Sequence, residues 1–228
     1  MRDAMERAGI RTRIIRGITG LSWDADGNIL DSEGSYIKWV WKTWAWESAL
    51  DQIRDECDND ARKLRDYKPG ERHEGPVRLV DVLLRKNLMV FEPLWTLIPS
   101  NKAILPILWA MFPNHPYLLK SSYSLTDELK GSGYVIKPIV GRGGSNISIV
   151  DQYARVVVET KGEFEDRDQI YQEMFRLPFV GGRNAQLSTF TVSARYAGAC
   201  VRTDQSPVIT NESDCLALRI VGDEAMHP

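Results

Sequence analysis

Two β-type runs that flank a glycine-rich loop are the feature that most restricts the fold of this 228-residue chain. The runs are residues 133–140 and 147–150, and the loop between them reads Gly-Arg-Gly-Gly-Ser-Asn, residues 141–146. Short runs of β-branched residues bounded by glycine favour strands joined by a tight connection. The sequence therefore predicts a strand–loop–strand unit in the second half of the chain.

The remaining residues indicate further helices and mainly antiparallel strands, which together predict an α+β fold. In the first half we expect strands at 11–16 and 36–44, a hairpin at 20–31 with Asp26-Gly27 at its turn, and helical structure at 47–67. In the second half we expect a helix at 101–112 with Ser100 as N-cap and a kink at Pro106, strands at 170–175 and 216–221, and a strand pair at 186–196 and 198–202. We divide the chain into residues 1–98 and 99–228.

The charge balance and the hydropathy argue against binding to nucleic acid or to membranes. Lys plus Arg number 29 and Asp plus Glu number 31, so bulk charge gives the chain no attraction for nucleic acid or an anionic bilayer. No apolar run approaches the roughly 18 residues that span a membrane. The charged N-terminal residues lack the apolar stretch of a signal peptide.

The cysteine and histidine content restricts the chemistry further. Cys57, Cys200 and Cys215 are odd in number and widely spaced, which argues against a disulfide framework and predicts a cytoplasmic protein. With three histidines and no CxxC or HExxH motif, no transition-metal site is expected. A Cys–His nucleophilic pair from distant segments stays open, although no nucleophile motif accompanies it.

The glycine-rich loop, residues 141–146, is the strongest candidate for an anion site. Its glycines let backbone N–H groups converge on an anion, and Lys137 on the preceding strand adds the positive charge that a polyphosphate requires. The spacing fits neither a Walker loop nor GxGxxG. A lysine-bearing strand followed by a glycine flap is how ATP-grasp enzymes cover a nucleotide. The alternative is a glycine-rich turn beside a solvated lysine.

Three single residues are weaker candidates, each with a structural alternative. Lys102 is a second phosphate ligand or an exposed lysine near a helix start. Glu173 accepts from an adenine amino group or is a solvated carboxylate at a strand end. Arg202 steadies a developing phosphoryl or oxyanion charge or lies on the surface. The tryptophans of residues 39–46 are more typical of core packing than of a cation cage.

Six separated strings together resemble one family, the glutathionylspermidine synthetases, which are ATP-grasp ligases often fused to an amidase. In chain order they are WKTWAWES (41–48), EPLW (92–95), SNKAILPILW (100–109), YVIKPIVGRGGSNI (134–147), STFTVSARYAGACVR (188–202) and SPVITNESD (206–214). The resemblance covers nearly the whole chain. It implies an ATP-grasp-like α+β fold, with residues 1–98 contributing to a glutathione site and residues 99–228 binding the nucleotide.

The resemblance also implies an activity and roles for individual residues. In the family, ATP phosphorylates the glycine carboxylate of glutathione, and a spermidine amine attacks the acyl phosphate. The implied ATP-binding residues are Lys102, Lys137, Gly141, Gly143, Gly144, Ser145, Asn146, Glu173 and Gln186. Arg142, Thr43 and Ser48 would line the glutathione site. Arg202 would stabilise the acyl-transfer transition state, and Asp214 would pair with a polyamine nitrogen.

One departure from the family concerns Mg²⁺, which ATP-grasp chemistry requires. Family members carry the Asp, Glu and Asn ligands of the metal, with acidic residues for the polyamine, in a stretch before the point where this chain begins. The sequence offers no replacement, so we expect no metal ligands here and a preceding segment or partner chain that supplies them. The chain is then the C-terminal portion of such an enzyme, or a short, degenerate ATP-grasp module that binds nucleotide or a partner without turnover alone.

Overall fold

A computed structural model describes residues 1–222, which fall into two compact units, Met1–Leu97 and the residues from Ile98 onward. The first unit contains α1 (Arg2–Arg7), β1 (Ser22–Trp23), β2 (Ile29–Leu30), β3 (Trp39–Trp41), α2 (Trp46–Glu56), α3 (Ala61–Asp66), α4 (Leu79–Leu83), β4 (Met89–Phe91) and the 3₁₀ turn η1 (Leu94–Thr96). The helix α5 (Leu97–Ser100) spans the division.

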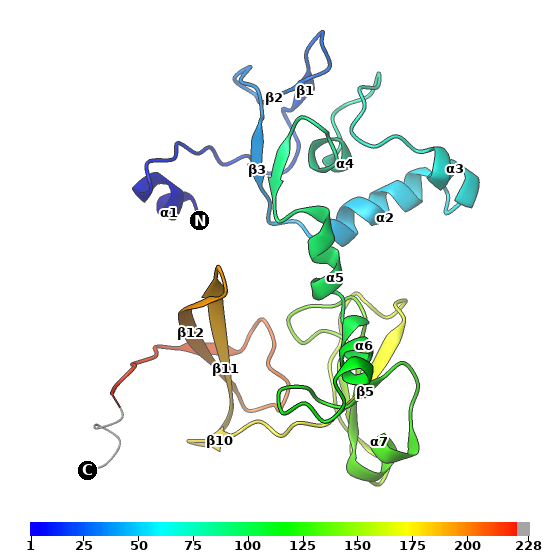
Figure 1. Ribbon diagram of the computed structural model, residues 1–228, viewed down its shortest axis with the longest axis vertical. Helices are drawn as coiled ribbons and strands as arrows, with labels where there is room; N and C mark the ends of the chain where they lie inside the picture. Colours follow the sequence, from blue (N-terminus) through cyan, green and yellow to red (C-terminus); the bar gives the residue numbers. More distant parts are fainter. Residues whose placement is uncertain (223–228) are drawn as a thin grey trace. The chain divides into compact units, whose positions relative to one another are not determined.

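The second unit is richer in strands (Figure 1). It contains α6 (Ile104–Met111), β5 (Ser121–Ser122), α7 (Asp127–Ser132), β6 (Tyr134–Pro138), β7 (Ser148–Val150), β8 (Val156–Glu159), β9 (Gln169–Glu173), β10 (Phe179–Val180), β11 (Arg183–Val192), β12 (Arg195–Asp204) and β13 (Asp214–Leu216). The expected α+β class, with mainly antiparallel strands, is confirmed.

Short strands and helices around small apolar clusters build the first unit. The hairpin expected at residues 20–31 is present as β1 and β2, with Gly27 in the left-handed region at φ 77°. Strands β3 and β4 pair in parallel, because α2, α3 and α4 lie between them in the chain. Buried Ile29, Val77, Val82 and Leu88 form one cluster beside these strands.

Three details of the first half differ from expectation. Residues 11–16 are irregular, because alternating charged residues give the run no apolar face to bury. The strand expected at 36–44 is only Trp39–Trp41, since β4 offers three pairing residues. The helical stretch at 47–67 divides into two helices, where Asp58 and Asn59 adopt positive φ and Asp60 caps α3 by accepting from two backbone N–H groups.

The five-stranded sheet of the second unit has the order β5-β9-β6-β7-β8 with every pair antiparallel. Its middle strand β6 carries Lys137 and pairs with β7 across the glycine-rich loop, which confirms the predicted strand–loop–strand unit. Val135 and Ile149 from these two strands pack with Val208 in one buried cluster. Lys137 is half-buried, on a strand that has a neighbour on each side.

A long β-hairpin dominates the second sheet, whose order is β10-β11-β12-β13 (Figure 1). Its turn consists of Ser193 and Ala194, both at positive φ, as a two-residue type I′ turn requires. The expected strand pair is present and antiparallel, but its turn was misplaced: Arg195 and Tyr196 belong to β12 and pair with Val192 and Thr191 of β11. The last strand begins earlier than expected, at Asp214, and ends at Leu216.

The helix expected at 101–112 begins at Ile104, so the predicted cap is wrong. Ala103 is the N-cap, and Ser100 ends the preceding helix α5. Pro106 lies in the first turn of α6, where a backbone N–H has no partner within the helix, so the expected kink does not arise. The asparagine side chain at position 101 accepts from the N–H of Ala103 at 2.8 Å and orders this start.

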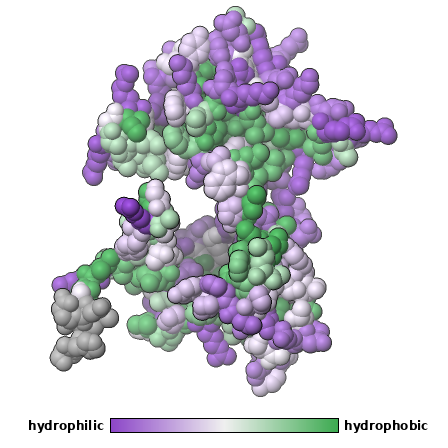
Figure 2. All heavy atoms as spheres, in the orientation of Figure 1, coloured by the Kyte–Doolittle hydropathy of each residue, from purple (hydrophilic) through white to green (hydrophobic). Residues whose placement is uncertain are grey.

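Apolar side chains also reach the surface of both units, as the green areas of Figure 2 show. Trp39 and Trp95 are each 64% exposed, and Phe190 on the long hairpin is 55% exposed. All three cysteines are free thiols. Among residues 1–222 we find no helix of the length and apolarity that a membrane crossing requires.

Candidate functional site: a lysine pair beside a glycine flap

Two lysines and the glycine-rich loop meet in the second unit. We call residues 141–146 the flap. The ammonium group of Lys102 donates to the backbone oxygen of Gly141 at 2.6 Å, and the backbone N–H of Lys102 donates to the oxygen of Ile139 at 2.8 Å. The start of α6 is thereby held against the end of β6 and the first residue of the flap. This contact joins residues that are 39 positions apart and places the Lys102 ammonium group beside the flap, as one part of a cationic surface.

Lys137 completes this surface from the middle of the five-stranded sheet. Its ammonium group donates to Oε1 of Gln172 at 2.5 Å, and Nε2 of Gln172 donates to Oγ of Ser121 at 2.9 Å. Burial, together with the positive charge of Lys102, lowers the pKa of Lys137 to about 8. Two neighbouring cations favour an anion, because the anion relieves their repulsion.

The flap has a definite conformation that depends on its glycines. Gly143 and Gly144 adopt φ values of +52° and +72°, in the left-handed region. The backbone oxygen of Gly144 accepts from Oγ1 of Thr160 at 2.6 Å. The side-chain oxygen of Asn146 accepts from the N–H of Phe164 at 3.0 Å. The flap is thus fastened to the chain segment that follows β8.

The two residues expected near the adenine and the ribose lie on different sheets. Glu173 ends β9, next to Gln172, and its backbone N–H donates to the oxygen of Lys120 at 2.8 Å. Gln186 is exposed on β11, directly opposite Arg202 on β12. Glu173 therefore belongs to the strand next to Lys137, whereas Gln186 belongs to the sheet that carries Arg202.

Arg202 and Asp214 lie on neighbouring strands of the four-stranded sheet. The half-buried guanidinium group of Arg202 donates to the backbone oxygen of Thr210. Asp214 begins β13, and its carboxylate accepts from Arg183 at 2.5 Å. The predicted polyamine ligand is therefore already neutralised by an arginine of its own sheet.

The residues expected to line the glutathione site are all exposed, and they come from both units. Thr43 and Ser48 belong to the first unit, at the approach to α2 and in its first turn. Arg142 belongs to the flap of the second unit. Within the first unit, the neighbouring Lys42 is buried and pairs with Glu92 at 3.2 Å, while the indole N–H of Trp46 donates to the oxygen of Glu92 at 2.9 Å. These bonds hold the segment that carries Thr43 and Ser48.

Sequence reasoning missed the polar groups that surround the predicted residues. Gln172 and Ser121 are buried and position the ammonium group of Lys137, and Asn211 packs against the flap. The alternation of β9 offered one signal, because Gln172 occupies an inward position between half-buried neighbours. A polar side chain at such a position needs a partner. Nothing local in the sequence names that partner.

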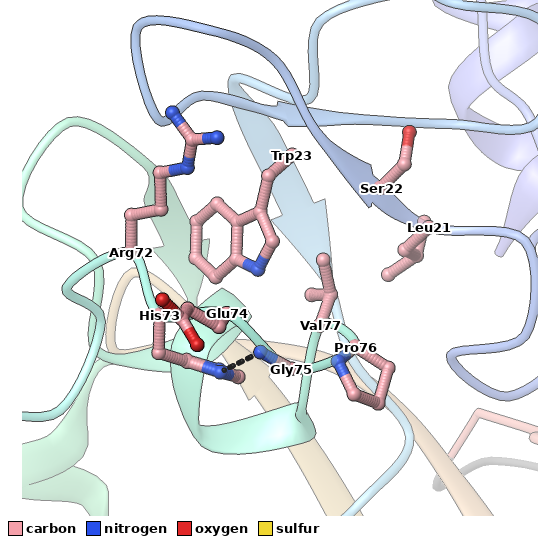
Figure 3. A pocket seen from close by; sticks show the side chains of 9 residues that line it. All are labelled: Leu21, Ser22, Trp23, Arg72, His73, Glu74, Gly75, Pro76 and Val77. Atoms are coloured by element: carbon pink, nitrogen blue, oxygen red, sulfur yellow. Dashed lines mark hydrogen bonds between the residues drawn. The ribbon is translucent and has the colours of Figure 1, made fainter.

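A separate pocket of about 570 Å³ lies in the first unit, and Figure 3 shows its lining. Trp23 and His73 face it, with ring centroids 5.7 Å apart. Nδ1 of His73 accepts from the N–H of Gly75 at 3.0 Å, so Nε2 carries the proton and donates to Asp81 at 2.8 Å. This pocket contains none of the residues predicted for nucleotide or substrate binding, and its histidine is committed to a buried carboxylate.

A metal site would need acidic residues, cysteines or histidines close together. Within residues 1–222, no three such side chains gather in a way that could hold a metal ion. His227 lies outside the described residues. The positive charges of Lys102 and Lys137 attract an anion and repel a metal cation.

Comparison with known proteins agrees with the sequence motifs. The family described as "Glutathionylspermidine synthase preATP-grasp" matches residues 1–221. The bifunctional glutathionylspermidine synthetase/amidase of Escherichia coli K12 is 49% identical over 223 residues, which are 97% of this chain and 35% of that protein. The trypanothione synthetase of Crithidia fasciculata is 39% identical over 222 residues, which are 96% of this chain and 33% of that protein.

The chain thus spans about a third of the length of these curated relatives. The family description names the preATP-grasp part of the fold, so the ATP-grasp architecture expected for residues 99–228 stays a prediction. A match over almost every residue, together with close relatives, shows that the chain belongs to the glutathionylspermidine synthase family.

Proposed function

We propose that this chain forms part of an ATP-dependent ligase that joins the glycine carboxylate of glutathione to an amine of spermidine. The names of its relatives support this class of reaction. The structural observation that carries the proposal is the pair of Lys102 and Lys137 beside the flap. A site for polyphosphate needs such positive charge close to backbone N–H groups that glycine leaves accessible.

We assign the nucleotide to an ATP-grasp-like region within residues 99–228. Lys102 and Lys137 would hold the phosphates, and residues 141–146 would close over them. Glu173 and Gln186 would contact the adenine and ribose end. The position of Glu173 on the strand next to Lys137 supports its part of this assignment.

The proposed reaction has two steps that balance. A carboxylate oxygen of glutathione attacks the γ-phosphorus of ATP, the bond to the bridging oxygen breaks, and ADP leaves. The spermidine nitrogen then attacks the carbonyl carbon, phosphate leaves with its oxygen, and the nitrogen loses a proton. Arg202 would stabilise the negative charge that develops on the oxygens, a role whose loss costs about 3 kcal/mol or more of activation free energy.

The remaining substrate contacts are assigned to the polar residues that the family resemblance implies. Thr43, Ser48 and Arg142 would contact glutathione, whose carboxylates suit an arginine and whose peptide groups suit hydroxyl groups. Asp214 would contact a polyamine nitrogen. We place the Mg²⁺ ligands in a segment or partner beyond this chain. The free cysteines agree with a cytoplasmic location.

Isothermal titration of the chain with ATP, with and without Mg²⁺, tests the nucleotide site. Lys137→Ala should abolish the heat of binding, because it removes a half-buried cation from the phosphate position. Lys130→Ala is the matched control, since Lys130 is an exposed lysine of the same unit that pairs with Asp127. A folded wild-type chain that gives no heat at millimolar ATP would overturn the proposal for this chain.

A further inference from the structure

A single loop touches both the flap and Arg202. We call residues 208–213 the Thr210 loop; it lies between β12 and β13, and Val208 anchors it in the cluster with Val135 and Ile149 of the five-stranded sheet. The loop therefore connects the sheet that carries Lys137 with the sheet that carries Arg202. Both connections lie within the second unit.

On one side the loop is packed tightly against the flap. A Cβ atom added to Gly144 would lie 2.5 Å from the backbone oxygen of Ile209, and one added to Gly143 would overlap the side-chain amide of Asn211. Real Cβ atoms do not approach other atoms this closely, so only glycine leaves room for the loop. The Thr210 loop therefore forms a wall against Gly143 and Gly144, and it limits movement of the flap toward it.

On the other side the loop fixes the guanidinium group of Arg202. The backbone oxygen of Thr210 accepts a hydrogen bond from Arg202. The same oxygen accepts from the N–H of Ser213 at 3.2 Å. The N–H of Thr210 donates to Oγ of Ser213 at 2.7 Å. Both polar backbone groups of Thr210 thus depend on Ser213.

Ser213 is itself held by a carboxylate. Its buried hydroxyl group donates to Oδ2 of Asp204 at 2.5 Å, and the N–H of Ser206 donates to Oδ1 of Asp204 at 2.9 Å. The hydrogen bonds from Ser213 and Ser206 lower the pKa of Asp204. The carboxylate is therefore ionised at neutral pH, and a hydrogen bond to an ionised acceptor is about twice as strong as a neutral one.

We propose that Ser213 and Asp204 are positioning residues, which hold the Thr210 loop so that the flap and Arg202 are aligned together. The value of this alignment rests on the proposed function, because the flap would cover the phosphates while Arg202 would face the acyl-transfer step. Neither Ser213 nor Asp204 needs to touch a substrate. Their effect passes through Thr210 to Arg202 and through Ile209 and Asn211 to the flap.

Hydrogen exchange in the absence of any ligand tests the linkage directly. Ser213→Ala should make amides of residues 141–146 exchange about tenfold faster, while amides of β6 and β9 keep their rates. Ser122→Ala is the matched control, because it removes a hydroxyl group that accepts from the N–H of Ser124 at 3.2 Å on the edge strand β5. Ser122→Ala should leave hydrogen exchange in the flap unchanged. Ser213→Thr, which keeps a hydroxyl group at this position, should leave the flap amides as protected as in wild type.

Two results would overturn the proposal. Unchanged exchange of the flap in Ser213→Ala would show that the loop does not hold it. Equal acceleration in the flap, β6 and β9 would show that Ser213 serves the stability of the whole unit. If Ser213→Ala does not fold, Asp204→Asn gives the same test, because it keeps the shape of the side chain and removes the charge.

Titration with ATP separates this proposal from the proposed function. If wild type binds ATP, Ser213→Ala should weaken binding about tenfold and Ser122→Ala should not. If wild type binds no ATP, the proposed function fails for this chain, and the exchange measurement still decides whether the loop holds the flap. ATP binding that is equally tight in Ser213→Ala with a loosened flap would overturn the role in nucleotide binding.

Discussion

The ammonium group of Lys137 lies 2.5 Å from Oε1 of Gln172, which is a neutral partner for a half-buried lysine. A lysine in such a position usually pairs with a carboxylate, because burial disfavours an unneutralised charge. Gln172 orients the ammonium group and does not neutralise its charge. The lowered pKa of about 8 is the consequence of burial and of the nearby Lys102, and it makes the site sensitive to pH just above neutrality.

We expect the affinity for ATP to fall as the pH rises from about 7 to about 9.5. Lys137 loses its proton near pH 8 in the free protein, and the neutral amine attracts the phosphates less. The loss should reach about tenfold by titration calorimetry across this range. Lys130→Ala should keep the pH profile, and a flat profile in the wild type would contradict the assignment of Lys137.

The free energy of unfolding should depend on pH in the opposite direction to the ATP affinity, and through the same residue, Lys137. The folded pKa of Lys137 lies near 8 and the reference value is 10.5, so between these values the unfolded chain holds the extra proton. Stability due to Lys137 therefore rises with pH over this interval, and below pH 8 the penalty for burying the charge is complete. The free energy of unfolding of wild type should therefore increase relative to that of Lys137→Met as the pH rises from about 7 to about 10.

Gly144→Ala should loosen the flap and weaken ATP binding. The substitution forces a side chain into the left-handed region at φ +72° and toward the oxygen of Ile209, at a cost of about 2 kcal/mol or more. Gly131→Ala is the control, because Gly131 lies in α7 with open space around it and alanine favours a helix. Thermal unfolding and titration with ATP measure the stability and the ATP affinity of both variants. If Gly144→Ala and Gly131→Ala gave the same values, the close contact at Gly144 would be contradicted.

The sequence predicted those elements whose signals are local. The strands on both sides of the flap were predictable from β-branched residues and glycine, and the flap itself from its glycine content. The parallel pairing of β3 with β4 was not, because it depends on 47 intervening residues whose packing leaves no periodic signal. The start of α6 was misplaced because Ser100 is a good N-cap by type, while tertiary contacts of Lys102 decide where the helix begins.

The site shows the same division between local and distant signals. Lys102, Lys137 and the flap each carry a local signal, their resemblance to family motifs links them, and the structure adds the contact of Lys102 with Gly141. The roles of Gln172 and Ser213 depend on partners that are 35 and 9 residues away. Such hydrogen bonds follow from the register of strands and the path of loops, which the order of residues does not reveal by itself.

Asp81→Ala should destabilise the first unit by about 3 kcal/mol. The fully buried carboxylate accepts from Arg78 and from His73; burial opposes its ionisation, but these hydrogen bonds outweigh burial and lower its pKa. Removing it leaves the half-buried donors Arg78 and His73 without their acceptor. Urea denaturation followed by tryptophan fluorescence reports on this unit, because all tryptophans except Trp109 lie in it. Asp127→Ala, at the exposed start of α7, should change the unfolding free energy little.

Arg183→Gln should increase the affinity for spermidine if Asp214 is its ligand. The guanidinium group of Arg183 lies 2.5 Å from the Asp214 carboxylate, so a polyamine nitrogen must compete with an arginine for the same oxygens. Glutamine removes the competing charge and keeps much of the side-chain length. Arg195→Gln, at the tip of the same hairpin, is the matched control for the change of net charge. Titration with spermidine should give about fivefold tighter binding for Arg183→Gln alone. Weaker binding would mean that Arg183 and Asp214 form a structural pair, and equal gains in both variants would reduce the effect to overall charge.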